Sequence, residues 1–164
     1  MVEKIGIPAM LEQTAEECSE LSMAAIKLLR ILYGENPTPV TEEEAQKALK
    51  EEFSDVMFCA SDLGLTYKPV YKAGDIPADR KLTLELLAKS AADMASDALC
   101  WSFLARSSGE DHSTMLGLGQ DFSAIEELAG GLGISYDVQM EEEKQKRFRD
   151  RWNTAHKENE QERI

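Results

Sequence analysis

The chain has 164 residues, with 18 Lys and Arg against 31 Asp and Glu, and a formal net charge of −13. This length allows a domain to bury its core without disulfides or a structural metal, and a hydrophobic content of 43% excludes a disordered acidic tail. The acidic excess argues against a polynucleotide partner, because binding nucleic acid depends on Lys and Arg that displace counterions.

The cysteines predict a reducing compartment. Cys18, Cys59 and Cys100 cannot all pair within one chain, and each lies among apolar residues. This pattern is typical of small core residues in a cytoplasmic protein. Apolar runs fall short of the roughly 18 residues of a membrane span, and the sequence does not start with a basic and then apolar leader. We therefore expect a cytoplasmic protein with no membrane partner.

Glycine and proline divide the chain into candidate helices. Stretches without either residue cover 9–33, 40–63, 78–108 and 134–164, and a short helix is expected near 120–129. Thr41 followed by Glu44 forms a capping box, which predicts that the second helix begins at about residue 42. Alternating β-branched runs are absent, so strand signals are weak.

These elements predict an all-α fold, a helical bundle of four to five helices. We expect a single domain over 1–164, with a motif-bearing helix pair at 9–65 and additional helices within 78–160. Residues 66–79 and 109–119 are expected to form internal loops. Whether an acidic side chain is buried in such a bundle depends on the face of the helix that carries it.

Acidic residues fall on the apolar faces of the first two long helices. On a helical projection of 9–33, Glu17 lies within the apolar arc and Glu20 at its border, while Glu16 points farther out. On the second helix, Glu52 lies in the middle of the buried face and Asp55 follows one turn later. Each helix thus directs an acid-x-x-acid pair toward the core.

Buried carboxylates need compensating charge. Salt bridges from Lys27, Lys47 or Lys50 at the edge of the bundle are one interpretation. Divalent cations are the other, and oxygen-only ligands favour Mg²⁺ or Mn²⁺ over zinc or copper. A ferritin-like di-iron site is disfavoured because its Glu-x-x-His pairs are missing; the two histidines are His112 and His156.

These residues resemble a known family. Glu16-Glu17-Cys-Ser-Glu20, followed by Glu52-Phe-Ser-Asp55, is similar to the paired Glu-Glu-x-x-Glu and Glu-x-x-Asp motifs of the MazG-like all-α nucleoside triphosphate pyrophosphohydrolases. The likeness covers about residues 9–65. It implies Mg²⁺-dependent hydrolysis of a (deoxy)nucleoside triphosphate to the monophosphate and pyrophosphate.

The resemblance also implies residue roles. Matching the motif makes Glu17, Glu20, Glu52 and Asp55 the metal ligands and Glu16 an auxiliary acid. A carboxylate not fully committed to metal, Glu16 or Glu20, would act as the catalytic base.

The second half departs from the family pattern, because it holds no second copy of the paired motif. Asp93 and Asp97, four apart on the third helix, are expected to be polar-face residues, although they would suit the completion of a site. The related dimeric dUTPases use similar acids in a longer chain, which leaves specificity for dUTP, dCTP or a modified nucleotide as an alternative.

Basic residues cluster between 144 and 151. Lys144, Arg147 and Arg151 share one helical face and suit a phosphate clamp, while a solvated amphipathic helix is the simpler interpretation. Lys27, two turns beyond Glu20, is a further candidate for binding a triphosphate oxygen.

Two further expectations concern partners. A non-enzymatic acidic helical adaptor that binds a basic protein remains the alternative function, because of the net charge and the missing second motif. We also expect a homodimer or homotetramer, because a two-helix site and a poorly matched second half leave apolar surface for a symmetric copy to cover.

Overall fold

The computed structural model describes residues 1–34, 36–72, 74–108 and 116–136, together with Gln139, Glu143, Lys146, Arg147 and Asp150. This part of the chain is helical and carries no strand, which confirms the predicted all-α class. Within it lie α1 (Val2–Ile5), α2 (Ile7–Tyr33), α3 (Glu42–Asp62), α4 (Arg80–Ser108) and α5 (Leu116–Gly131). None of the described helices is long and apolar enough to cross a membrane.

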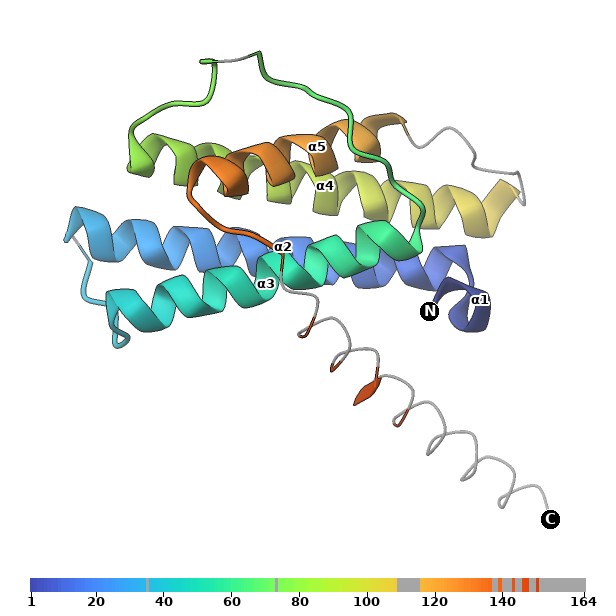
Figure 1. Cartoon of the computed structure of the whole chain (residues 1–164). Coiled ribbons are helices and arrows are strands. Elements are labelled where there is room, and N and C mark those ends of the chain that lie inside the picture. Colours follow the sequence, from blue (N-terminus) through green and yellow to red (C-terminus); the bar gives the residue numbers. More distant parts are fainter. Residues whose placement is uncertain are drawn as a thin grey trace.

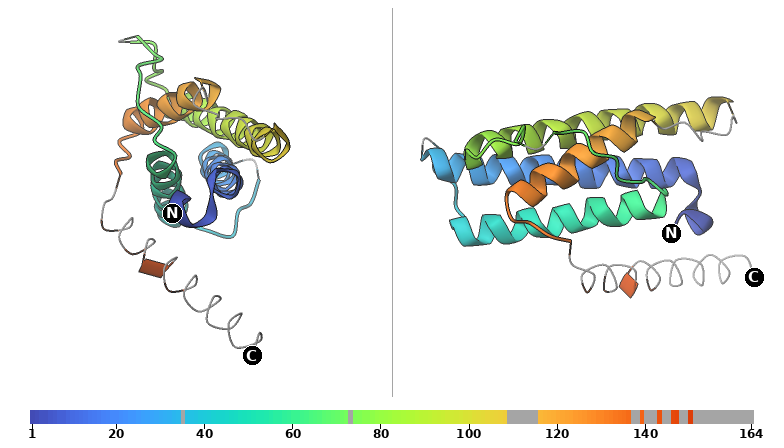
Figure 2. Two further views of the ribbon diagram at one scale, coloured as in Figure 1. Left: turned by 90° about the vertical axis from the view of Figure 1, so that its right-hand side faces the viewer. Right: turned by 45° about the horizontal axis from the view of Figure 1, so that its top comes forward.

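The long helices form two layers (Figures 1 and 2). α2 and α3 run antiparallel in one layer, and α4 and α5 form the other. α2 packs against both α3 and α4, while α5 packs against α4. One apolar core joins the four helices, with fully buried side chains such as Leu21, Val56, Met94 and Ile125. α2 therefore links the two layers through this core.

The ends of the first two long helices follow local rules. Gly34 ends α2 in the left-handed region at φ 70°, a conformation that glycine adopts without steric cost. Thr41 caps α3: its hydroxyl accepts from the Glu44 amide, and the Glu44 carboxylate accepts from the Thr41 amide at 2.7 Å. The capping box thus begins α3 at Glu42, as predicted.

One carboxylate of α5 holds the long connection between α3 and α4. Glu127 accepts hydrogen bonds from the Tyr67 hydroxyl at 2.7 Å and from the Tyr71 amide at 2.8 Å. The Val70 amide also donates to it. The loop therefore lies against α5, where Figure 1 shows it passing over the upper layer. Its satisfied backbone groups explain why a segment without secondary structure keeps a defined path.

The second half differs in two respects from the expectations. α5 begins at Leu116, earlier than the expected 120, and residues 109–115 lie outside the described part. Cys18 and Cys59 are buried and form no disulfide, as predicted, but the prediction for Cys100 was wrong, because this residue is exposed. It lies on the outer face of α4 beside Leu99, which is 55% exposed. Most of 134–164 also lies outside the described residues.

Candidate metal centre

Three carboxylates converge where α2 faces α3. One oxygen from each of Glu17, Glu20 and Glu52 lies within 4.8 Å of the other two. Within the described part of the chain, no other three side chains of His, Cys, Asp or Glu converge in this way. Three hard oxygen donors at such separations suit a divalent cation of the magnesium type.

Glu17 and Glu20 reach this position because they lie one turn apart on α2. Glu17 is only 5% exposed, so its carboxylate has lost most of its water. Gln13, one turn before it, donates a hydrogen bond from Nε2 to Glu17 Oε1 at 2.7 Å. This amide orients the buried carboxylate and keeps it an acceptor. Helical spacing correctly indicated the inward direction of Glu17, but not the role of Gln13.

Burial and the neighbouring carboxylates raise the pKa of Glu52. Burial, followed by the charge of Glu20 and the charge of Asp55, raises the pKa of Glu52 to about 7. A hydrogen bond with Glu20 and the charge of Glu17 act in the same direction. The cluster therefore holds a proton near neutral pH that a cation would displace.

Asp55 lies one turn further along α3 and is half-buried. It is close enough for its charge to act on Glu52, yet it does not belong to the converging group of three. Its carboxylate lines a neighbouring pocket of about 710 Å³. Glu52 lines the same pocket, so the two acids of the second motif share one opening.

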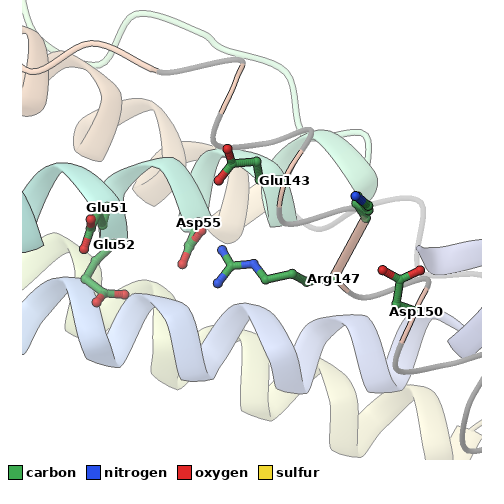
Figure 3. A pocket seen from close by; sticks show the side chains of 7 residues that line it. Glu51, Glu52, Asp55, Glu143, Arg147 and Asp150 are labelled. Atoms are coloured by element: carbon green, nitrogen blue, oxygen red, sulfur yellow. The ribbon is translucent and has the colours of Figure 1, made fainter.

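Basic side chains from the C-terminal region meet these acids. Lys146 and Arg147 line the pocket of Asp55, and Figure 3 shows the Arg147 guanidinium directed toward Asp55. Glu51, Glu143 and Asp150 complete the lining. Arg147 thus lies beside the acids of α3, and its role in binding phosphate stays a prediction. Lys144 and Arg151, the other members of the predicted clamp, lie outside the described residues.

A second, smaller groove connects the acids with Lys27. Its volume is about 170 Å³, and Glu20, Lys27 and Glu52 line it together with Met23 and three alanines, Ala24, Ala45 and Ala48. The small alanine side chains leave room between the two helices. Lys27 is exposed and lies where it could meet an anion that binds through a cation at the carboxylates.

Glu16 behaves differently from its neighbour. It is exposed, lies outside the converging group, and accepts a long hydrogen bond of 3.4 Å from Gln13 Nε2. The structure thus agrees with the outward direction expected from the helical projection. As a base, Glu16 would have to act from the rim of the site.

No family model matches the chain, and no curated protein or solved structure matches it either. The resemblance of its two acidic motifs to the MazG-like family therefore stays a prediction.

A second group of acids lies between α4 and α5. Burial and the charges of Asp97 and Asp93 raise the pKa of Asp121 to about 6, and Lys89 opposes this rise. Asp93 is exposed and forms an ion pair with Lys89, while Asp97 is half-buried beside Gly117. The polar-face prediction holds for Asp93; Asp97 instead occupies a helix contact.

The buried Cys18 thiol lies between the two groups. Burial, followed by the charges of Glu17 and Asp121, raises the pKa of Cys18 to about 12. The thiol is therefore protonated at neutral pH, which makes it a poor nucleophile.

Several pocket residues were not predicted as site residues. Ala45 is buried and Ala48 half-buried where they line the groove of Lys27. Their signal in the sequence is the spacing of small residues one and two turns before Glu52. Glu143, Lys146 and Asp150 reach the Asp55 pocket through tertiary packing. Helical spacing on α2 and α3 alone contains no signal for them.

Proposed function

We propose that the protein is a Mg²⁺-dependent nucleotide pyrophosphohydrolase that converts a (deoxy)nucleoside triphosphate to the monophosphate and pyrophosphate. The convergence of Glu17, Glu20 and Glu52 within 4.8 Å is the observation that carries this proposal. Oxygen-only donors favour Mg²⁺, with Mn²⁺ as a substitute. Asp55, one turn away, would complete the ligand set.

The neighbouring residues suit a polyphosphate. A bound Mg²⁺ would supply charge neutralisation for the phosphate oxygens and would acidify water. Lys27, in the groove of Glu20 and Glu52, would bind a phosphate oxygen. Arg147 would bind another from the side of Asp55. Glu20, or Glu16 at the rim, would accept the proton of the attacking water.

A panel of dNTPs and NTPs, with and without Mg²⁺, tests the proposal directly. We expect metal-dependent release of pyrophosphate from at least one of them, and turnover of none would overturn it. Relative kcat/KM values over dUTP, dCTP and modified nucleotides would identify a narrower specificity.

The alternative function, an acidic helical adaptor for a basic protein, makes the opposite prediction for metal binding. Calorimetry with Mg²⁺ or Mn²⁺ would then show no heat of binding, because the inward acids would be compensated within the protein. We expect binding that disappears when Glu52 is changed to Gln, because this substitution removes one of three converging ligands.

The proposal includes a homodimer or homotetramer in the cytoplasm. α4 carries large apolar side chains on its outer surface, with Phe103 71% exposed and Leu99 55% exposed. A second copy would cover them, since symmetric dimers are the commonest assemblies. Light scattering at micromolar concentration should show a mass above that of one chain; a monomer would contradict this.

A further inference from the structure

A separate pocket of about 420 Å³ lies on α3 away from the carboxylate cluster. It shares no lining residue with the groove of Glu20, Lys27 and Glu52. Its walls come from α2, α3, the start of α4 and the segment that follows α5. The lining residues are Leu28, Glu43, Gln46, Lys47, Leu49, Lys50, Arg80, Leu84, Leu132, Gly133, Ile134 and Ser135.

The base of this pocket is apolar. Leu28, Leu49 and Leu84 line it, and each is at most 2% exposed, so these side chains belong to the core. Leu132 and Ile134 add half-buried apolar surface from the chain after α5. Volumes of about 300–1,000 Å³ with mainly apolar walls are typical of small-molecule sites.

Three basic side chains lie at the rim of the pocket, each on an element of an otherwise acidic protein. Lys47, Lys50 and Arg80 line it, against the single carboxylate of Glu43. Arg80 contacts Glu42 at 2.8 Å, and Lys47 lies 3.6 Å from Glu51. Both pairs are solvent-exposed, and such pairs contribute little stability, so Lys47 and Arg80 can exchange these carboxylates for a bound anion.

We propose that this pocket binds a small organic anion with a flat apolar body. The body would lie on the leucine surface, and its carboxylate, sulfonate or phosphate group would meet Lys47, Lys50 and Arg80. The three basic side chains above the apolar base indicate the ligand class, because a neutral apolar molecule would leave their N–H donors unused. The inference goes beyond the proposed hydrolase and does not depend on it.

A pair of fluorescent probes tests the proposal without any variant. 8-Anilinonaphthalene-1-sulfonate carries an aromatic body and one sulfonate, and N-phenyl-1-naphthylamine is the same body without charge. Titrations with EDTA present exclude divalent cations. We expect saturable binding of the sulfonate about tenfold tighter than of the amine. Equal affinities, or tighter binding of the amine, would overturn the proposal.

Matched charge variants locate the probe. Lys47→Gln with Lys50→Gln should weaken sulfonate binding about tenfold, because two rim charges are lost. Lys4→Gln with Lys68→Gln removes two exposed charges elsewhere and should leave affinity within about twofold. Circular dichroism checks that both variants fold. Equal effects of the two double variants, or no effect of the first, would refute the assignment.

The exposed apolar surface of α4 is the competing location for such a probe. Phe103→Ser, at a residue 71% exposed, tests it. If this substitution abolishes sulfonate binding while the Lys47 and Lys50 variant retains it, the probe lies on α4 and the proposal is wrong. Retained binding in Phe103→Ser together with loss in the lysine variant supports the pocket.

Discussion

Acidic side chains gather both between α2 and α3 and between α4 and α5, but the two groups are built differently. Glu17, Glu20 and Glu52 bring their oxygens within 4.8 Å of one another. Asp121, between α4 and α5, is surrounded by the charges of Asp93 and Asp97 and is partly compensated by Lys89. The number of acids is the same in both groups.

The difference shows that acid content alone does not define a cation site. Between α4 and α5 a lysine and open solvent reduce the repulsion, because Asp93 is exposed and paired with Lys89. Between α2 and α3, Glu17 is buried and Glu52 has a pKa of about 7. Convergence and burial therefore create the stronger demand for an external cation.

The largest expected effect is on activity, and it should distinguish the acids between α2 and α3 from those between α4 and α5. Glu17→Gln should lower kcat/KM for pyrophosphate release by about 1,000-fold or more, because it removes the most buried of the three donors. Asp97→Asn, in the other group, should leave kcat/KM within about twofold. Pyrophosphate release measures both. Full activity of Glu17→Gln would remove this residue from the site, and equal losses would erase the distinction between the groups.

Metal binding should stabilise the protein through the acids between α2 and α3, and not through those between α4 and α5. At a Mg²⁺ concentration about 100 times Kd, the free energy of unfolding should rise by about 2.7 kcal/mol, equivalent to roughly 5–10 °C in Tm. Glu52→Gln should lose most of this increase, and Asp121→Asn should keep it. Thermal unfolding with and without Mg²⁺ provides the measurement. If Mg²⁺ raised the Tm of both variants equally, the cation would bind at a position other than Glu52.

The smallest expected effect is the pH dependence of the metal-free protein. The pKa of Glu52 is raised from 4.5 to about 7 and that of Asp121 from 3.8 to about 6. Each group binds its proton more tightly in the folded chain, so stability is greatest below the unfolded pKa and falls as pH rises through the folded pKa. With allowance for solvent exposure, each contributes about 1 kcal/mol.

Variants should separate these two contributions. Glu52→Gln should remove the part of the loss of stability that extends to pH 7. Asp121→Asn should remove the part that ends near pH 6. Denaturant unfolding at pH 4, 6 and 8 in EDTA measures this. A wild-type stability that increases over the same range would contradict the sign.

Local sequence rules predicted much of the fold and part of the site. The capping box of Thr41 and Glu44 fixed the start of α3, and helical spacing gave the inward direction of Glu17 and Glu52. Both signals operate within one helix. Lys27 and Glu20 line one groove because they share a face of α2, whereas Glu52 reaches this groove from α3.

Features that depend on contacts between distant segments were not predictable in this way. Asp121 meets Asp97 across 24 positions of sequence, and Glu127 accepts from the Tyr67 hydroxyl across 60. The placement of Arg147 beside Asp55 likewise depends on how the C-terminal region packs. Cys100 was misassigned because α4 is apolar on both its core and outer faces, so its pattern does not indicate which side is buried.

The unequal exposure of the cysteines makes the chain suitable for labelling at one position. Cys18 and Cys59 are buried, and the raised pKa of Cys18 suppresses its thiolate form, whereas Cys100 is exposed on α4. A maleimide dye or spin label would therefore attach to Cys100 without any engineered cysteine. Cys100 adjoins Leu99 on the outer face of α4. The distance between two such labels would therefore show whether copies of the chain contact each other through this face.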